Sequence, residues 1–319
     1  MRRVLCLAAI ATLTVAAGCV LPNLLFREPP YPPVSSVKSR AGAHVLLIAV
    51  DGLRPDAITP ERTPTLYRLI RRGAYTPTAQ NVLPPRTLPN HAAMLTGLTA
   101  ENHGLTSNFY QGPRRLEVPT VFDRARAAGM STALYYGKDK FLIFERRDSL
   151  NWAERRDGGD VAADFARDFR KAKWNLSMLC FPDADSAGHA HGWMSPQYLD
   201  AVRRIDGYIA LALAGVDAAG LGDRVHILLT ADHGGQGTSH SDDVAVNRTI
   251  PFLVVGPDVQ PGALTGPGGR RVSITDMAPT AARLLGLPDE PCDGRVLAGA
   301  FRSEPGAVAT VRTVATPAR

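Results

Sequence analysis

The sequence contains few cysteines, only four among 319 residues. Cys6 and Cys19 fall in the N-terminal leader, which leaves Cys180 in an apolar segment and Cys292 in a polar one. Their separation along the chain says nothing about proximity, so we expect two unpaired thiols.

A stripe of basic residues is also missing. The formal net charge is +6, but the excess is scattered in short pairs such as Arg71-Arg72 and Arg155-Arg156. This distribution argues against a nucleic-acid-binding surface. No internal repeat is visible, and nothing within 44–300 reads as a domain linker. We therefore expect a single domain over 44–300 and a tail over 301–319, with no protein partner indicated.

The N-terminal apolar run, Val4 to Ala17, is short for a membrane span. Arg2-Arg3 precede it and Gly18-Cys19 follow it, which is the pattern of an export signal. We expect a signal peptide over 1–18 and a proline-rich tether over 19–43.

The end of this signal, Val15-Ala-Ala-Gly-Cys19, resembles a bacterial lipobox, in which the cysteine is lipidated. An ordinary cleaved signal is the alternative. Val20 after the cysteine favours the outer membrane. We therefore expect an outer-membrane lipoprotein that faces the periplasm or, without the lipid, a periplasmic protein.

The rest of the chain alternates between strand and helix patterns. Strand-like runs lie at 44–50, 74–83, 132–136, 174–181, 225–230 and 250–255, and helical patterns lie at 64–73, 89–97, 119–129, 159–173, 197–213 and 277–285. This alternation predicts an α/β fold with a central, mostly parallel β-sheet flanked by helices.

Acidic and imidazole side chains recur where these strands end. Asp51 follows the first strand, and Asp185 with His189 follows the strand that ends at Phe181. The strand 225–230 is followed by a third group, made of Asp232, His233 and His240. Strand ends that meet at one sheet edge can bring these groups into one crevice. Carboxylates with several imidazoles suit zinc first, with manganese or iron as alternatives.

Thr87 lies just ahead of the helix that Pro89 is expected to open. A helix N-terminus favours a phosphate group. A hydroxyl at that place, bound to a metal, can lose its proton at neutral pH and act as a nucleophile. The alternative is a simple helix cap.

Taken together, these motifs resemble the alkaline phosphatase superfamily, and most closely its type I phosphodiesterase/nucleotide pyrophosphatase branch. The resemblance covers about 44–300 and rests on Val50-Asp51-Gly52-Leu-Arg54, Thr87-Leu-Pro89-Asn90-His91, Thr96-Gly97, His103-Gly104, Asp185-Ser-Ala-Gly188-His189, Asp232-His233-Gly234 and Val272-Ser-Ile-Thr-Asp276-Met-Ala-Pro279-Thr280. It implies an alkaline-phosphatase-like sandwich, two zinc ions per chain and a covalent intermediate on the threonine.

The resemblance also implies the ligand sets. One metal would be held by Asp51, Thr87, Asp232 and His233, and the other by Asp185, His189 and a third histidine, for which His240 is the first choice and His191 the alternative. Asn108 stands where the branch keeps an asparagine that binds a phosphoryl oxygen.

The substrate is less well defined by the resemblance. Nucleotide-cleaving members commonly carry aromatic residues at the positions of Leu88 and Cys180, although Phe109 and Tyr110 could take their place. Separately, Lys138 and Lys140 look like the lysine pair with which phosphonoacetate hydrolases bind a carboxylate; a solvated charged turn is the alternative.

The expected activity is therefore hydrolysis of a small phosphorylated substrate by a metal-dependent phosphodiesterase. A phosphomonoesterase or phosphonate hydrolase is the second possibility. A non-catalytic binding lipoprotein on the same scaffold is the third.

Overall fold

The computed structural model describes residues 31–109, 112 and 116–302. The predicted signal over 1–18, the lipidation site Cys19, the substrate-binding candidate Tyr110 and residues 303–319 of the predicted tail lie outside the described residues. Within the described ranges, none of the helices is both long enough and apolar enough to cross a membrane.

Residues 32–302 are built around one eight-stranded sheet with the strand order β4-β3-β5-β1-β6-β7-β2-β8. The strands are β1 (His44–Val50), β2 (Ala74–Gln80), β3 (Thr132–Tyr136), β4 (Trp152–Arg155), β5 (Leu176–Phe181), β6 (Val225–Thr230), β7 (Thr249–Val255) and β8 (Gly262–Ala263). The five strands from β4 to β6 in this order run parallel, and β7 is antiparallel to both of its neighbours, β6 and β2. The expected mostly parallel α/β sheet is thus confirmed.

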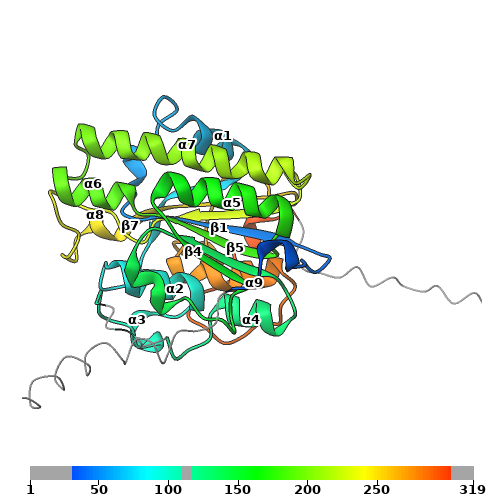
Figure 1. Cartoon of the computed structure of the whole chain (residues 1–319). Coiled ribbons are helices and arrows are strands. Elements are labelled where there is room, and N and C mark those ends of the chain that lie inside the picture. The colour runs from blue at the N-terminus through cyan, green and yellow to red at the C-terminus, as the bar shows by residue number, and fades with distance from the viewer. Residues whose placement is uncertain (1–30, 110–111, 113–115, 303–319) are drawn as a thin grey trace, which may run out of the picture. The chain divides into compact units, whose positions relative to one another are not determined.

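Helices cover both faces of the sheet, as Figure 1 shows. One layer contains α1 (Pro64–Arg72), α5 (Gly158–Ala172), α6 (Asp183–His191) and α7 (Pro196–Ala218); the other contains α2 (Thr87–Thr96), α3 (Ala100–His103), α4 (Val121–Ala127) and α9 (Met277–Leu284). The short α8 (Ala245–Arg248) precedes β7, and 3₁₀ helices lie at Val34–Ser36, Pro55–Ala57, Asp139–Ile143, Pro267–Gly269, Ile274–Asp276 and Ala298–Ala300.

The apolar run of β1 occupies the middle of this core. All seven residues of His44–Val50 are buried, and β1 pairs in parallel with β5 on one side and β6 on the other. A strand covered by helices on both faces must be apolar throughout, which explains why the run is uninterrupted.

The strand β2 brings a fourth chain segment to the same edge of the sheet. Because β2 is antiparallel to β7, which is itself antiparallel to β6, β2 points in the same direction as β1. Its carboxyl end therefore reaches the edge where β1 ends. The expected strand 74–83 stops at Gln80, and α2 starts at Thr87 rather than at Pro89.

The described part of the predicted tether is packed against the domain. Val34 is buried, and the Arg40 N–H donates to Asn175 Oδ1 at 2.8 Å. These contacts place part of the predicted tether on the domain, and the boundary expected at residues 43/44 stays a prediction.

Candidate active site

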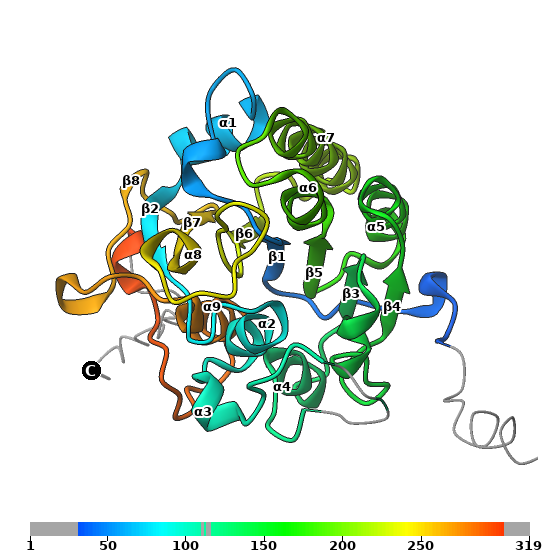
Figure 2. The same ribbon diagram turned by 90° about the vertical axis from the view of Figure 1, so that its left-hand side faces the viewer.

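Three adjacent parallel strands end at the candidate site. Asp51 follows β1, Asp185 lies in α6 after β5, and Asp232 follows β6. The Asp51 N–H donates to the Phe181 carbonyl at 3.0 Å, and the Asp185 N–H donates to the Asp51 carbonyl at 3.0 Å. These backbone bonds hold the first two carboxylates side by side. In Figure 2 the ends of β1, β5 and β6 lie near the centre, between α6 and α2.

The backbone of Gly52 forms hydrogen bonds with three separate parts of the site. Its N–H donates to Asp232 Oδ1 at 3.0 Å, and its carbonyl accepts from Trp193 Nε1 and from the Tyr198 hydroxyl, both at 2.9 Å. Its φ is +73°, and a Cβ at this position would lie 3.0 Å from the Asp185 Cα. Both facts require glycine here.

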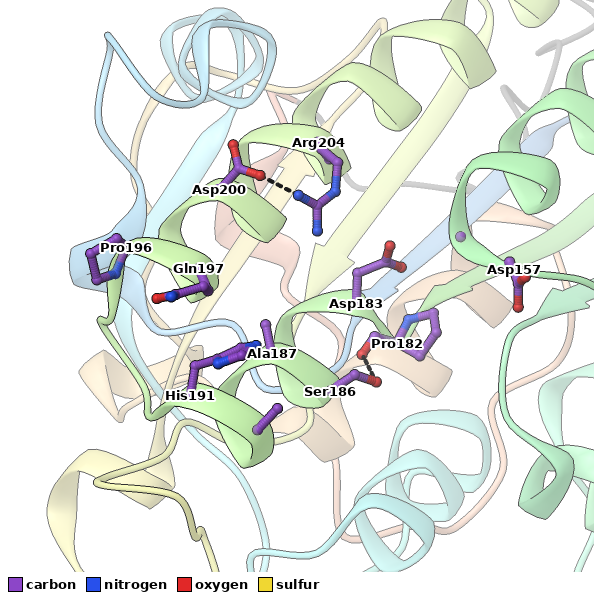
Figure 3. A pocket seen from close by; sticks show the side chains of 12 residues that line it. Asp157, Pro182, Asp183, Ser186, Ala187, His191, Pro196, Gln197, Asp200 and Arg204 are labelled. Carbon is purple, nitrogen blue, oxygen red and sulfur yellow. Dashed lines mark hydrogen bonds and ion pairs between the residues drawn. The ribbon is translucent and has the colours of Figure 1, made fainter.

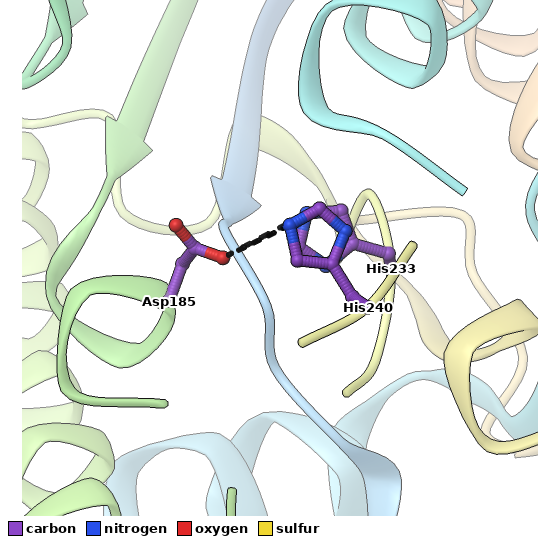
Figure 4. Close-up of side chains that lie close together, drawn as sticks. All are labelled: Asp185, His233 and His240. Carbon is purple, nitrogen blue, oxygen red and sulfur yellow. Dashed lines mark ion pairs between the residues drawn. The ribbon is translucent and has the colours of Figure 1, made fainter. Parts of the chain in front are cut away.

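His233 lies at the centre of the carboxylate cluster. Its Nε2 is 3.4 Å from Asp51 Oδ1, 3.9 Å from Asp185 Oδ1 and 3.2 Å from Asp232 Oδ2. The His240 ring stacks on the His233 ring with centroids 3.6 Å apart, and its Nε2 is 3.7 Å from Asp185 Oδ1 (Figure 4).

Each of the three carboxylates has one oxygen that accepts hydrogen bonds and one that does not. Lys138 Nζ donates to Asp51 Oδ2 and Asp185 Oδ2, and the N–H groups of Gly52 and His233 donate to Asp232 Oδ1. The other oxygens, Asp51 Oδ1, Asp185 Oδ1 and Asp232 Oδ2, are buried without a hydrogen-bond partner among the described residues. These are the oxygens that face His233. Buried acceptors without donors are costly unless a cation is bound to them, so they fit a metal centre.

The imidazole rings of His189, His233 and His240 are all oriented by a backbone carbonyl. The Nδ1 atoms lie against backbone carbonyls, 2.9 Å from Thr238 for His189, 2.8 Å from Gly234 for His233 and 2.7 Å from Pro85 for His240. A carbonyl can only accept, so each Nδ1 donates, and in the neutral ring Nε2 keeps a free lone pair. This is the arrangement that metal-bound histidines usually show.

Two groups of side chains can therefore hold a cation. Asp51, Asp232 and His233 form one group, and Asp185, His233 and His240 form the other; within each, the ligand atoms lie within 4.8 Å of one another. His189 approaches Asp185 Oδ1 from the solvent side, with its Nε2 at 3.4 Å and its side chain about half exposed.

Burial controls the proton affinities in the cluster. Burial and the charges of Asp51 and Asp185 raise the pKa of Asp232 well above its ordinary value. Burial and the neighbouring His240 lower the pKa of His233 to about 3, so its ring is neutral. A neutral ring is the form that binds a metal.

Thr87 is the first residue of α2 and is buried. Its Oγ1 lies 3.5 Å from His233 Nε2, which brings the hydroxyl to the edge of the cluster. The loop before it is held by Asn90, whose Oδ1 accepts from the Val82 N–H and whose Nδ2 donates to the Arg86 carbonyl. The backbone that leads to Thr87 is thus held in place by Asn90.

Asn108 contacts the same helix end. Its Oδ1 accepts from the Leu88 N–H at 3.0 Å, which satisfies one donor of the first helical turn. In the described part of the chain its Nδ2 group has no acceptor. Those donors therefore remain for a ligand next to Thr87.

The two lysines differ in their contacts. Lys138 Nζ lies 2.6 Å from Asp51 Oδ2 and 2.5 Å from Asp185 Oδ2. Burial alone would lower the pKa of Lys138, but the two carboxylates raise it above its ordinary value. Lys140 is half-buried and has no ion pair with any of the described residues, and burial and the charge of Lys138 lower its pKa.

The other residues expected at the substrate site are distributed unevenly. Leu88 is fully buried and offers no side-chain surface to a substrate, whereas Phe109 is 79% exposed. Cys180 is buried, and both Cys180 and Cys292 are free thiols.

His191, the alternative third ligand, lies apart from the cluster. It is exposed and lines a cavity of about 780 Å³ on the outer side of α6, together with Asp183, Asp200 and Arg204 (Figure 3). The structure therefore brings His240, and not His191, to Asp185.

Some residues of the site could not be found from the sequence. Trp193 donates to the Gly52 carbonyl, and its ring lies 5.1 Å from that of His189 and 5.8 Å from that of His240. Asn81 Nδ2 donates to the Asp232 carbonyl at 3.0 Å and so ties the end of β2 to the end of β6. Both contacts cross between distant segments and leave no local pattern.

Relatives of known fold resemble this structure closely. Murine ectonucleotide pyrophosphatase/phosphodiesterase 5 matches with a TM-score of 0.66 and 18% identity, covering 79% of this chain and 97% of that one. The human protein of the same name matches with a TM-score of 0.70 and 17% identity, covering 82% and 100%. A structure of the murine protein, an inactive variant, contains AMP.

Sequence comparison gives the same relatives. Human ectonucleotide pyrophosphatase/phosphodiesterase family member 5 is 28% identical over 216 residues, which are 60% of this chain and 44% of that protein. A bis(5'-adenosyl)-triphosphatase from mouse is 23% identical over 221 residues, 60% of this chain and 46% of that protein. The chain thus spans less than half the length of these relatives.

The sequence model of the type I phosphodiesterase/nucleotide pyrophosphatase family matches residues 45–255. This range contains all the strand-end carboxylates and imidazoles described above. The chain belongs to the type I phosphodiesterase/nucleotide pyrophosphatase family.

Proposed function

We propose that the chain is a metal-dependent phosphodiesterase of the nucleotide pyrophosphatase type, with Thr87 as its nucleophile. One observation carries this proposal. The buried Thr87 hydroxyl, at a helix N-terminus, lies 3.5 Å from His233 Nε2. That nitrogen lies within 3.9 Å of three carboxylate oxygens that lack donors within the described ranges. Family membership and the nucleotide bound to a structural neighbour support the same assignment.

Asp51, Thr87, Asp232 and His233 would hold one divalent ion, and Asp185, His189 and His240 the other. Zinc suits this mixture of carboxylate and imidazole, and manganese or iron would also fit. When bound, the ions would lower the pKa of the Thr87 hydroxyl and neutralise charge on the phosphoryl oxygens.

Thr87, Asn108 and the N-terminus of α2 have different roles in the reaction. Thr87 Oγ1 forms a bond to phosphorus while the bond from phosphorus to the leaving oxygen breaks; the hydroxyl proton passes to solvent and the leaving oxygen takes one up. Asn108 Nδ2 donates to a nonbridging oxygen, and the dipole of α2 stabilises the negative charge. A water oxygen then bonds to the phosphorus of this nucleotidyl-threonine, or of the phosphothreonine formed from a monoester, while the bond from phosphorus to Thr87 Oγ1 breaks. Oγ1 takes up a proton, which restores the hydroxyl.

The Thr87→Ala variant tests the nucleophile. We expect hydrolysis of a chromogenic nucleotide diester to fall at least about 1,000-fold, because the attacking oxygen is removed. Metal content should stay at the wild-type level, because Asp51, Asp232 and His233 remain to hold the ion. Thr96→Ala is the matched control, since Thr96 lies on the same helix and its hydroxyl donates to the Ala92 carbonyl. Activity within ten-fold of wild type in Thr87→Ala would exclude this role.

A phosphomonoesterase or phosphonate hydrolase is a second candidate, and the half-buried Lys140, which has no ion-pair partner among the described residues, favours it. An ammonium available near the cluster would suit a substrate with an extra carboxylate or a dianionic phosphate. Comparing a nucleotide diester, an aryl diester, an aryl monoester and phosphonoacetate decides between the two. Preference for the monoester or phosphonoacetate, lost in Lys140→Met, would replace the phosphodiesterase assignment.

A further inference from the structure

Lys138 contacts both halves of the site. It follows β3, and its ammonium lies between Asp51 at the end of β1 and Asp185 in α6. Both contacts go to Oδ2, at 2.6 Å and 2.5 Å. The Oδ1 atoms of the same carboxylates have no donor among the described residues and face His233.

We propose that Lys138 is a positioning residue that ties Asp51 to Asp185 through their outer oxygens, so that each carboxylate presents a single oxygen to the metal centre. This inference rests on the proposed two-metal function. It gives Lys138 a role different from that of a substrate ligand.

Charge and burial explain why a cation is needed between these groups. Asp51 and Asp185 are both nearly fully buried and lie close enough for one ammonium to reach both. Two buried carboxylates repel each other strongly unless a cation is bound between them. With its Oδ2 held, neither carboxylate can rotate to chelate an ion with both oxygens.

Lys140 provides an internal comparison. It lies two residues further along the same turn, and it is half-buried near the same carboxylates, but it forms no ion pair within the part of the chain that the structure describes. Removing either lysine takes one positive charge from the neighbourhood. Only Lys138→Met also frees the two Oδ2 atoms.

Cobalt(II) substitution tests the proposal with a readout other than activity. Four-coordinate Co²⁺ absorbs visible light more strongly than five- or six-coordinate Co²⁺. We expect the Co²⁺-loaded Lys138→Met protein to lose at least half of the wild-type absorption, because a freed carboxylate can bind through both oxygens. Lys138→Arg, which keeps two donors and the charge, should recover most of it, and Lys140→Met should match wild type.

An unchanged Lys138→Met spectrum, or the same change in Lys140→Met, would overturn the proposal. A merely structural effect on folding would not change the spectrum of the folded, loaded protein.

A second measurement separates this proposal from the proposed function. In excess chelator, Lys138→Met should unfold at a temperature at least about 5 °C below wild type, since two buried carboxylates lose their common donor. Lys140→Met should stay within about 2 °C of wild type.

If the wild-type protein binds no Co²⁺, the two-metal function fails. The chelator experiment alone then tests whether Lys138 bridges Asp51 and Asp185. If Co²⁺ binds and Lys138→Met is as stable as wild type in chelator, the bridge fails and the two-metal function stands.

Discussion

Gly52 is the residue on which the geometry of the site depends most directly. Its N–H and its carbonyl reach Asp232, Trp193 and Tyr198, and its backbone adopts a left-handed conformation. A side chain here would both strain the backbone and push against Asp185.

We expect Gly52→Ala to lower the free energy of unfolding by about 1–3 kcal/mol and to reduce metal content and diester hydrolysis together. Urea unfolding and metal analysis of the purified variant check this. Gly207→Ala is the control with the opposite sign. Gly207 lies inside α7, and apart from its chain neighbours and the adjoining backbone of the helix, none of the described atoms lies within 4 Å of the position that a Cβ would take. Alanine should therefore stabilise by about 0.5–1 kcal/mol. Equal effects of the two substitutions would contradict the role of Gly52.

His91 makes the stability of the protein depend on pH. Its Nδ1 donates to the Thr87 carbonyl, and burial lowers its pKa to about 4, so the folded state holds the ring neutral. The unfolded chain takes up a proton near pH 6.5. Stability from this group is therefore complete above pH 6.5 and is lost as the pH falls towards 4.

The His91→Asn variant isolates this effect. Wild-type unfolding free energy in chelator should fall between pH 7 and pH 5 by about 2 kcal/mol more than that of the variant. Urea unfolding at the two pH values measures the difference. Parallel pH dependence in the two proteins would mean that His91 is not the group responsible.

Among the secondary-structure elements, α1 and α7 are joined by a cap from outside the helix. The buried Asp206 of α7 accepts from the Thr65 N–H at 3.0 Å and from the Leu66 N–H at 2.8 Å. These N–H groups belong to the first turn of α1, where Pro64 has no N–H to satisfy. A carboxylate at this end also interacts favourably with the helix dipole.

We expect Asp206→Ala to destabilise the protein by about 2–4 kcal/mol, since two buried donors lose their acceptor. Asp200→Ala is the control, because Asp200 lies on the same helix but its side chain is 45% exposed and pairs with Arg203 and Arg204 at the surface. Surface ion pairs contribute little to stability, so this variant should unfold close to wild type. Denaturant midpoints of the two variants decide the matter, and similar midpoints would refute the cap.

The sequence patterns identify most elements, because buried strands and amphipathic helices are coded locally. They do not predict the α6 helix, since Asp183–His191 has neither an apolar stripe nor a strong start signal. The gathering of Asp51, Asp185 and Asp232 follows from their places after strands. The contact between His240 and Asp185 and the ion pairs of Lys138 cannot be predicted in this way, because they depend on how the loops run through space.

At the level of the whole molecule, we propose that the N-terminal leader directs the protein to the membrane. We propose that residues 1–18 are removed and that Cys19 is lipidated. The Cys19→Ser variant should then move from the membrane fraction to the soluble periplasmic fraction while keeping its diester hydrolase activity. Mass spectrometry of the mature N-terminus provides the direct measurement. A wild-type N-terminus without lipid would favour the ordinary cleaved signal.

The reversed direction of β7 has a further consequence for this family of sites. β6 ends at the edge of the sheet where the site lies, and β7 starts at that edge. The segment between them therefore stays at this edge and needs no crossover helix, which a parallel neighbour would require. That segment carries His240. Asp232 and His233 lie on the same segment, close to the end of β6, whereas residues 241–245 beyond His240 are exposed. Loop grafting within 241–245 should therefore leave the sheet and the ligands in their places.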